Sequence, residues 1–411
     1  MSIRSSRVFA LGLVTFATFT DIVAYSVAVP VLPDIGRKFG ASPTMIGLLF
    51  ASFGVTLLAV SIPMGAVSDR IGRKAPLVGG LVVLSAATLL FAFAGSLPWL
   101  FAARLAQGAS DGVTWVVGFA LLADLYEPRE RGRATGIVMS GTSIALMLGP
   151  TLGGWLYEIG GAAFPFVIVA VMAGAAGVAM LWLKLPLRHA GREPVPMLAV
   201  LRMPAVVACA AAVITIAGTV SMLEPVLSLH LAMLGINPGR IGMVFGAASV
   251  ASPILHPIYG GLADRWGARR LTLWGLALSG CLLPILGAAS SFGSAVALFV
   301  VLAAALAMVI TPSLAYMAEA TSASGIESFG VAYGLYNVAW AVGLLGGPAL
   351  GGFLFERMSL ARLVLGWGPA VLLVAALLSR VKDGRDGQGG QERLEGQERL
   401  DGQDGQDWQD G

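Results

Sequence analysis

The chain has 411 residues, of which 57% are hydrophobic and only 12% are charged, and its mean hydropathy is +0.82. Soluble domains carry about 25% charged residues, so this composition excludes a soluble enzyme and a nucleic-acid-binding domain, although the net charge is +3. With three histidines and two cysteines, we expect no metal, cofactor or disulfide framework. No glycine precedes a lysine, which excludes the phosphate-binding loop of an ATP-driven pump.

Apolar runs long enough to cross a bilayer, about 20 residues each, follow one another along almost the whole chain. They predict an all-α membrane protein with twelve transmembrane helices, which is not an enzyme. The first run contains Asp21 and is too long for the apolar core of a signal peptide, so we expect it to be retained. The predicted spans are 8–32, 44–66, 75–95, 98–123, 134–157, 162–183, 205–230, 240–262, 271–290, 294–317, 329–352 and 361–380.

The lysines and arginines between these spans predict the orientation of the chain. With the amino terminus in the cytoplasm, the internal segments before the tail hold fifteen of these residues and the external loops hold five. Such an excess predicts that both termini are cytoplasmic. We therefore expect an integral multi-pass protein of a plasma (inner) membrane, monomeric, in contact with the lipid bilayer and with no nucleic acid.

The chain divides into two groups of six spans and a tail. Residues 1–183 are the predicted amino-terminal bundle, 184–204 the cytoplasmic linker, and 205–382 the carboxy-terminal bundle. The tail, 383–411, repeats G-Q-E-R-L and G-Q-D and carries a net charge of −6. Because it has no apolar face, we expect it to be disordered.

Two motifs recur in the two halves at nearly the same spacing. The loop after the second span reads GAVSDRIGRK and the loop after the eighth reads GGLADRWGARR, so that Asp69 and Asp264 are 195 residues apart. In the fifth and eleventh spans, G-P-x-L-G-G begins at Gly149 and at Gly347, 198 residues apart. The matched order indicates duplication, and paired six-helix halves commonly form transporters with a central site.

These motifs resemble those of a known family. G-x-x-x-D-R-x-G-R-K is similar to the signature of the major facilitator superfamily, and R-L-A-Q-G from Arg104 resembles its fourth-span motif. The glycine pattern from Gly141 to Gly154 resembles the motif of its antiporters. Asp21 and the Leu223-Glu224-Pro225 segment make the chain similar to drug:proton antiporters, particularly the branch of vesicular monoamine transporters. The resemblance covers all but the tail and implies two pseudo-symmetric six-helix bundles.

Few ionisable side chains lie well inside the predicted spans. A charge at the membrane centre costs at least about 2.5–3.5 kcal/mol and is usually functional. The main ones are Asp21, Arg104, Asp111 and Glu224. Since the first and seventh spans are equivalent in the two halves, we expect the carboxylates of Asp21 and Glu224 to face one cavity. A buried carboxylate can hold a proton or a cation but holds both poorly, which is the physical basis of antiport.

The resemblance implies roles for these side chains. Residues matching Asp21 and Glu224 serve in amine recognition and proton coupling, and the family assigns Arg104 a part in proton coupling. Asp111 is unusual for the family; it either neutralises Arg104, which we favour, or adds a third acid for a dicationic substrate. Asn337 stands where the amine transporters have an acid, and it cannot titrate. The ring of Tyr25, one turn beyond Asp21, is a candidate cation–π partner.

The resemblance also implies that the loop motif holds the halves together on the inside when the transporter faces out. Small residues every fourth position in the fifth span allow close helix approach. The candidate gating or conformational residues are Gly65, Asp69, Arg70, Gly72, Arg73, Asp264, Arg265, Gly149, Pro150, Gly347 and Pro348.

The sequence therefore predicts a proton-coupled antiporter that exports an organic cation or a drug-like amine, contributing to multidrug resistance. The alternative is a proton-coupled exporter of neutral metabolites such as sugars, and a third reading is a non-transporting membrane sensor or scaffold. An importer of phosphates or organic acids is disfavoured, because Arg104 is the only basic residue well inside a span.

Overall fold

The computed structural model describes residues 3–183, 203–322 and 329–381, and within these ranges the regular elements are all helices. Twelve of them are long and apolar enough to cross a membrane, which confirms the predicted fold class. The predicted linker, except for its last two residues, and the predicted tail lie outside the described residues.

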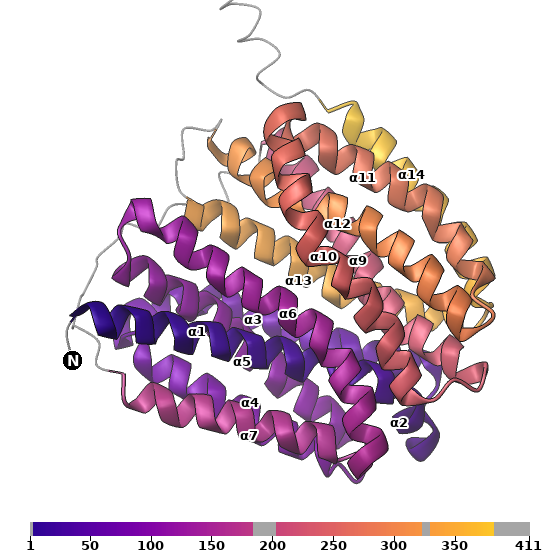
Figure 1. Ribbon diagram of the computed structural model, residues 1–411, viewed down its shortest axis with the longest axis horizontal. Helices are drawn as coiled ribbons and strands as arrows, with labels where there is room; N and C mark the ends of the chain where they lie inside the picture. Colours follow the sequence, from indigo (N-terminus) through magenta and orange to yellow (C-terminus); the bar gives the residue numbers. More distant parts are fainter. Residues whose placement is uncertain (1–2, 184–202, 323–328, 382–411) are drawn as a thin grey trace, which may run out of the picture.

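The helices of the first half are, in chain order, α1 (Ile3–Ser26), η1 (Val29–Val31), α2 (Leu32–Phe39), α3 (Pro43–Ile71), α4 (Lys74–Ala92), α5 (Leu97–Leu125), α6 (Pro128–Gly160) and α7 (Phe164–Leu181). Those of the second half are α9 (Pro204–Met233), α10 (Pro238–Trp266), α11 (Ala268–Leu282), η2 (Leu283–Ala288), α12 (Phe292–Ser322), α13 (Phe329–Phe355) and α14 (Leu360–Ser379). The two sets form two neighbouring bundles (Figure 1).

Two predicted spans are not single α-helices. The run 8–32 leaves α-geometry after Ser26 and continues through η1 into α2, while 271–290 ends in η2. Pro30 lies in η1, Pro33 is the second residue of α2, and Pro284 lies in η2. Proline has no N–H to donate and its ring clashes with the preceding turn, so the chain changes to a tighter helix around Pro30 and Pro284, while Pro33 occupies the first turn of α2, where its missing N–H leaves no helical bond unmade.

Glycines allow the same close packing in both halves. A Cβ on Gly149 of α6 would collide with the Ser26 hydroxyl at the end of α1, and a Cβ on Gly347 of α13 would collide with the Gly218 carbonyl of α9. The Ser221 hydroxyl of α9 in turn lies 3.2 Å from the Gly343 carbonyl oxygen of α13. The small residues predicted to form a tight seam therefore pack α6 on α1 and α13 on α9.

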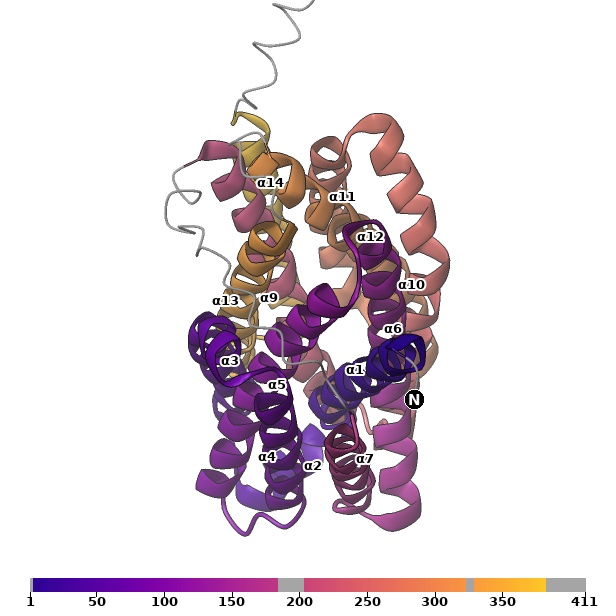
Figure 2. The same ribbon diagram turned by 90° about the vertical axis from the view of Figure 1, so that its left-hand side faces the viewer.

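The two halves meet along two helix pairs, α3 with α13 and α6 with α10, as Figure 2 shows from the side. A Cβ on Gly47 of α3 would strike the Pro348 carbonyl oxygen, and a Cβ on Gly242 of α10 would strike that of Pro150. Gly47 and Gly242 are 195 residues apart, the spacing of the sequence repeat. Pro150 and Pro348 thus lie at equivalent points of the boundary between the halves.

The tight contacts lie toward one end of the molecule, where α6 ends and α10 begins and where α13 ends and α3 begins. The charge pattern predicts that this end, called the outer end below, faces the outside. At the opposite end, Cβ atoms on Gly260 and Gly261 of α10 would have no described atom within 4 Å. The halves therefore meet closely at the outer end and separate toward the inner end.

This packing predicts that two neighbouring glycines differ in their tolerance of a methyl group. Gly347→Ala should lower the free energy of unfolding by about 1–3 kcal/mol, because the helices cannot separate without losing contacts. Gly346→Ala is the matched control, since a Cβ there meets open space, and it should be neutral or stabilise by up to about 1 kcal/mol. Thermal unfolding in detergent measures both, and equal effects would contradict the close packing.

Candidate functional site

The four ionisable side chains singled out in the sequence lie within the helices α1, α5 and α9. Asp21 and Arg104 are each only 1% exposed and Asp111 is 6% exposed, while Glu224 is partly buried. Such burial in membrane helices is costly for charges. The structure therefore places all four where their protonation and partners matter.

Tyr25, one turn beyond Asp21 on α1, contacts Glu224 of α9. The Tyr25 hydroxyl donates a hydrogen bond to the Glu224 carboxylate, and this bond joins the first half to the second. The Tyr25 ring packs against Phe50 and Phe53, at centroid distances of 5.7 and 5.0 Å. Tyr25 thus contacts Glu224 and lies one helical turn from Asp21 on α1, and the shared cavity for the two carboxylates stays a prediction.

Arg104 has a different environment from the one expected. Its guanidinium donates to the Tyr25 carbonyl oxygen at 3.3 and 3.4 Å and to Gln107 at 3.3 Å, and Gln107 donates to Thr88 at 3.0 Å. The charge lies over the Phe50 and Phe91 rings, 4.4 and 5.1 Å from their centroids. Its electrostatic partners are Tyr25 and Glu224.

In the part of the chain that the structure describes, no direct contact supports the favoured prediction that Asp111 neutralises Arg104, which stays a prediction. No ion pair joins the two among the described residues, although they lie two turns apart on one helix. The aromatic rings and the Tyr25 carbonyl surround the Arg104 guanidinium instead. Helical spacing alone placed the residues on one face, but it does not set the direction in which two long side chains point.

Asp21 and Asp111 form a second, purely acidic group. Neither oxygen of the Asp21 carboxylate has a hydrogen-bond partner, and the Oδ1 atom of Asp111 also lacks one. Thr114 lies beside Asp21, but its hydroxyl donates to the Ser110 carbonyl at 3.1 Å. The two acids are close enough to act on each other electrostatically. Buried acceptors are normally satisfied, so this pair is an exception that needs a partner.

Aromatic side chains continue from this acidic pair across the boundary between the halves. Trp115 interacts with Asp111 and packs on Phe119 at 5.5 Å, and Phe119 packs on Tyr333 of α13 at 4.9 Å. The Tyr333 hydroxyl interacts with Asn337. Of these residues Asn337 was predicted from the sequence, and the spacing of four residues from Trp115 to Phe119 was the available signal for the aromatic pair.

The loop motifs pair within one half. Arg73 bonds to Asp69, to Asp124 at 2.9 Å and to the Ser68 hydroxyl at 2.6 Å, all in the first half. Asp264 and Arg265, the repeat counterparts, are exposed. Gly72 and Gly267 have φ angles of +87° and +90°, which favour glycine.

The remaining predicted motif residues of the first half are Gly65, whose added Cβ would meet Val116 at 3.9 Å, and Arg70, which is exposed. Neither contacts the second half among the described residues. The predicted attachment of the halves through these motifs stays a prediction, since the inner ends are apart here.

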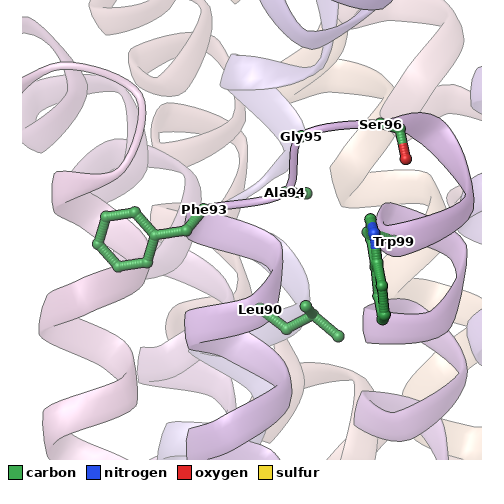
Figure 3. Close-up of a pocket in the computed structure, with 6 residues that line it drawn as sticks. All are labelled: Leu90, Phe93, Ala94, Gly95, Ser96 and Trp99. Carbon is green, nitrogen blue, oxygen red and sulfur yellow. The ribbon is translucent and has the colours of Figure 1, made fainter.

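A shallow hollow lies elsewhere, at the turn from α4 to α5 (Figure 3). Its lining residues are Leu90, Phe93, Ala94, Gly95, Ser96 and Trp99. None of these side chains can titrate or carry a charge, so this hollow has no chemistry that would select a charged ligand.

The chain is similar to known membrane transporters. The family model described as the Major Facilitator Superfamily matches residues 14–232 and 207–401. The human chromaffin granule amine transporter is 28% identical over 81% of this chain, which spans only 64% of that relative's length. The probable vesicular acetylcholine transporter-B of Danio rerio is 29% identical, over 90% of this chain and 78% of its own.

A solved structure has the same fold. A bacterial homologue of the human lysosomal transporter Spinster, crystallised in an inward-facing and unoccupied conformation, has a TM-score of 0.73 and 16% identity, over 91% of this chain and 92% of its own. With the family match covering both halves, and with amine transporters among its relatives, the chain belongs to the Major Facilitator Superfamily, as a twelve-helix membrane protein on the branch that resembles the vesicular amine transporters.

Proposed function

We propose that this transporter is a proton-coupled antiporter that exports organic cations, including drug-like amines, by alternating access. The observation that carries the proposal is the Asp21 carboxylate, which is 1% exposed and has both oxygens without a hydrogen-bond partner. An unpaired carboxylate in this environment is stable only when it holds a proton or a cation. A cation that binds at Asp21 then competes with the proton that the buried carboxylates of Asp21 and Glu224 hold, and this competition is the basis of antiport.

In this mechanism the acidic pair binds the substrate. A cationic nitrogen beside Asp21 would satisfy its free oxygens, with Asp111 as the second carboxylate and the indole of Trp115 as a neighbouring π-face. Because Arg104 is oriented by the Tyr25 carbonyl and Gln107, it does not compensate the charge of Asp111. The site therefore favours cations over neutral or anionic molecules.

Glu224 would carry the coupled proton. It accepts the hydrogen bond of Tyr25 and feels the positive charge of Arg104, so its ionised form is supported by two groups from the other half. A proton on Glu224 removes the charge that both groups face and weakens the connection between the halves. Protonation of Glu224 would thus favour separation of the halves, and loss of that proton would favour their closure.

The relatives support amines as the substrate class, because the names of two of them state that they transport amines. Placement in an inner plasma membrane with both termini in the cytoplasm, export of drugs and function as a monomer complete the proposal. The orientation is supported by the excess of basic residues in the segments assigned to the inside.

Asp21→Asn and Glu224→Gln should separate binding from coupling. In purified protein, monovalent organic cations should release protons from the unaltered chain. The Asp21 variant should bind cations at least tenfold less tightly, which corresponds to about 1.4 kcal/mol, and its proton release should fall with the binding. The Glu224 variant should keep binding but reduce the release to the same extent. A pH-sensitive dye measures release, and scintillation proximity measures binding.

Glu127→Gln, an exposed acid outside the spans, is the control and should behave as the unaltered chain. If neutral sugars released protons and cations did not, the exporter of neutral metabolites would be the better interpretation. If no compound released protons, the antiport proposal would fail, and the result would favour the non-transporting sensor or scaffold.

Asp111→Asn tests the second carboxylate. If Asp111 faces the substrate, the variant should bind dications about tenfold less tightly relative to monocations, because one of two attractive charges is removed. If Asp111 instead served to balance Arg104, affinities for both classes would fall together and the unfolding temperature would drop. Competition binding with monoamines and diamines of similar size gives the ratio.

A further inference from the structure

Two glutamates occupy equivalent positions at the outer end. Glu158 lies near the end of α6 and Glu356 directly follows α13, and they are 198 residues apart, the spacing of the G-P-x-L-G-G repeat. Both side chains are exposed. Neither belongs to a motif that the sequence analysis identified, and neither lies near the buried charges.

Each glutamate accepts hydrogen bonds from the first turn of a helix in the other half. The Glu356 carboxylate accepts from the Ser42 hydroxyl at 2.8 Å and from the Thr44 backbone N–H at 3.0 Å, at the start of α3. The Glu158 carboxylate accepts from the Gly239 backbone N–H at 3.1 Å, at the start of α10. Thr44 and Gly239 are 195 residues apart, so the recipients are also equivalent.

The two helix starts have the same construction. Ser42 and Asn237 are the N-cap residues, and their side chains accept from the N–H groups of Met45 and Arg240. A proline follows each cap and has no N–H. The N–H of the next residue, Thr44 or Gly239, is one of the donors that a helix cannot satisfy internally. This N–H group donates its hydrogen bond to the glutamate carboxylate of the opposite half.

Glycines bring the glutamates to their partners. One turn before Glu356, a Cβ on Gly352 would collide with the Pro43 carbonyl, and one turn before Glu158, a Cβ on Gly154 would collide with that of Pro238. Backbone therefore touches backbone between the halves at both points. The carboxylates can reach the helix starts only while this close approach exists.

We propose that Glu158 and Glu356 are a symmetric pair of latches that hold the outer end closed. Each places a negative charge at the positive end of a helix of the other half, an arrangement that stabilises the contact. Opening to the outside breaks both bonds and leaves the N–H groups of Thr44 and Gly239 to water. The latches therefore favour the conformation in which the cavity faces inward.

The test uses charge removal with little change of shape. Glu158→Gln and Glu356→Gln should each raise the ratio of outer-open to outer-closed molecules about fivefold, and the double variant about 25-fold, given typical charge–dipole strengths and separate positions. The full chain in nanodiscs, with Cys281→Ser, carries spin labels at Ile159 and Met233 for one seam and at Met45 and Phe353 for the other. Distance distributions between the labels give the ratio without any substrate.

Glu127→Gln is the matched control, because it removes an exposed carboxylate at the start of α6, at the opposite end of that helix. It should leave both distances unchanged. The proposal is overturned if the Glu158 and Glu356 variants keep the distances of the unaltered chain, or if the control opens the outer end equally. Because no substrate is needed, this outcome is independent of the antiport test.

The latch at Glu356 also has a defined pH dependence. The hydrogen bonds from Thr44 and Ser42, with a smaller contribution from Arg357, lower the pKa of Glu356 below its usual range. A lowered pKa means that the bond is present above the usual value of about 4.3 and is lost as the pH falls through the lowered pKa. The distance between labels at Met45 and Phe353 should stay constant from pH 8 to 5 and lengthen only in stronger acid. Lengthening between pH 7 and 5 would show that another group controls the seam.

Discussion

The hydrocarbon interior of the bilayer imposes the constraint on which the rest of this structure depends. No water is present there to satisfy a polar group, so backbone bonds close within helices and each charge needs a partner. Arg104 meets this requirement through Gln107, the Tyr25 carbonyl and three aromatic rings. The Asp21 carboxylate does not. Arg104 thus has hydrogen-bond and aromatic partners for its terminal nitrogens, although its Nε has none among the described residues, whereas both oxygens of Asp21 lack a partner; this contrast distinguishes a structural charge from one that can take a ligand.

Duplication gives the molecule two kinds of seam. Within each half, Gly149 packs α6 on α1 and Gly347 packs α13 on α9, contacts that need not change as the halves move. Between the halves, the same helices offer a different face, where Pro150 and Pro348 receive Gly242 and Gly47. α6 and α13 thus pack tightly within their own bundle on one face and contact the other bundle through a second face. This arrangement suits rocking of one bundle against the other.

Hydropathy and the cost of buried charge predicted the twelve spans and the four ionisable positions, because both are properties of single segments. The breaks at Pro30 and Pro284 changed only the local helix type. Partners were harder to predict: no ion pair joins Asp111 to Arg104 among the described residues, and the bond from Tyr25 to Glu224 was not foreseen. Residues 199 apart meet because the end of α1 and the following η1 and α2 approach α9, which no local pattern encodes. Pairing across helices therefore requires the tertiary structure.

The central charges and the outer end are linked through α1 and α9. The bond from Tyr25 to Glu224 and the bond from Ser228 to the Val29 carbonyl, 2.6 Å long, both join the halves, as the outer contacts do. A charged acceptor makes a hydrogen bond roughly twice as strong as a neutral one, so a proton on Glu224 reduces the free energy that holds α1 against α9. By linkage, anything that separates the halves at the outer end must change the proton affinity of Glu224 by the same free energy. In the proposed antiport, coupling between protons and access would then need no signal beyond the bonds that close the molecule.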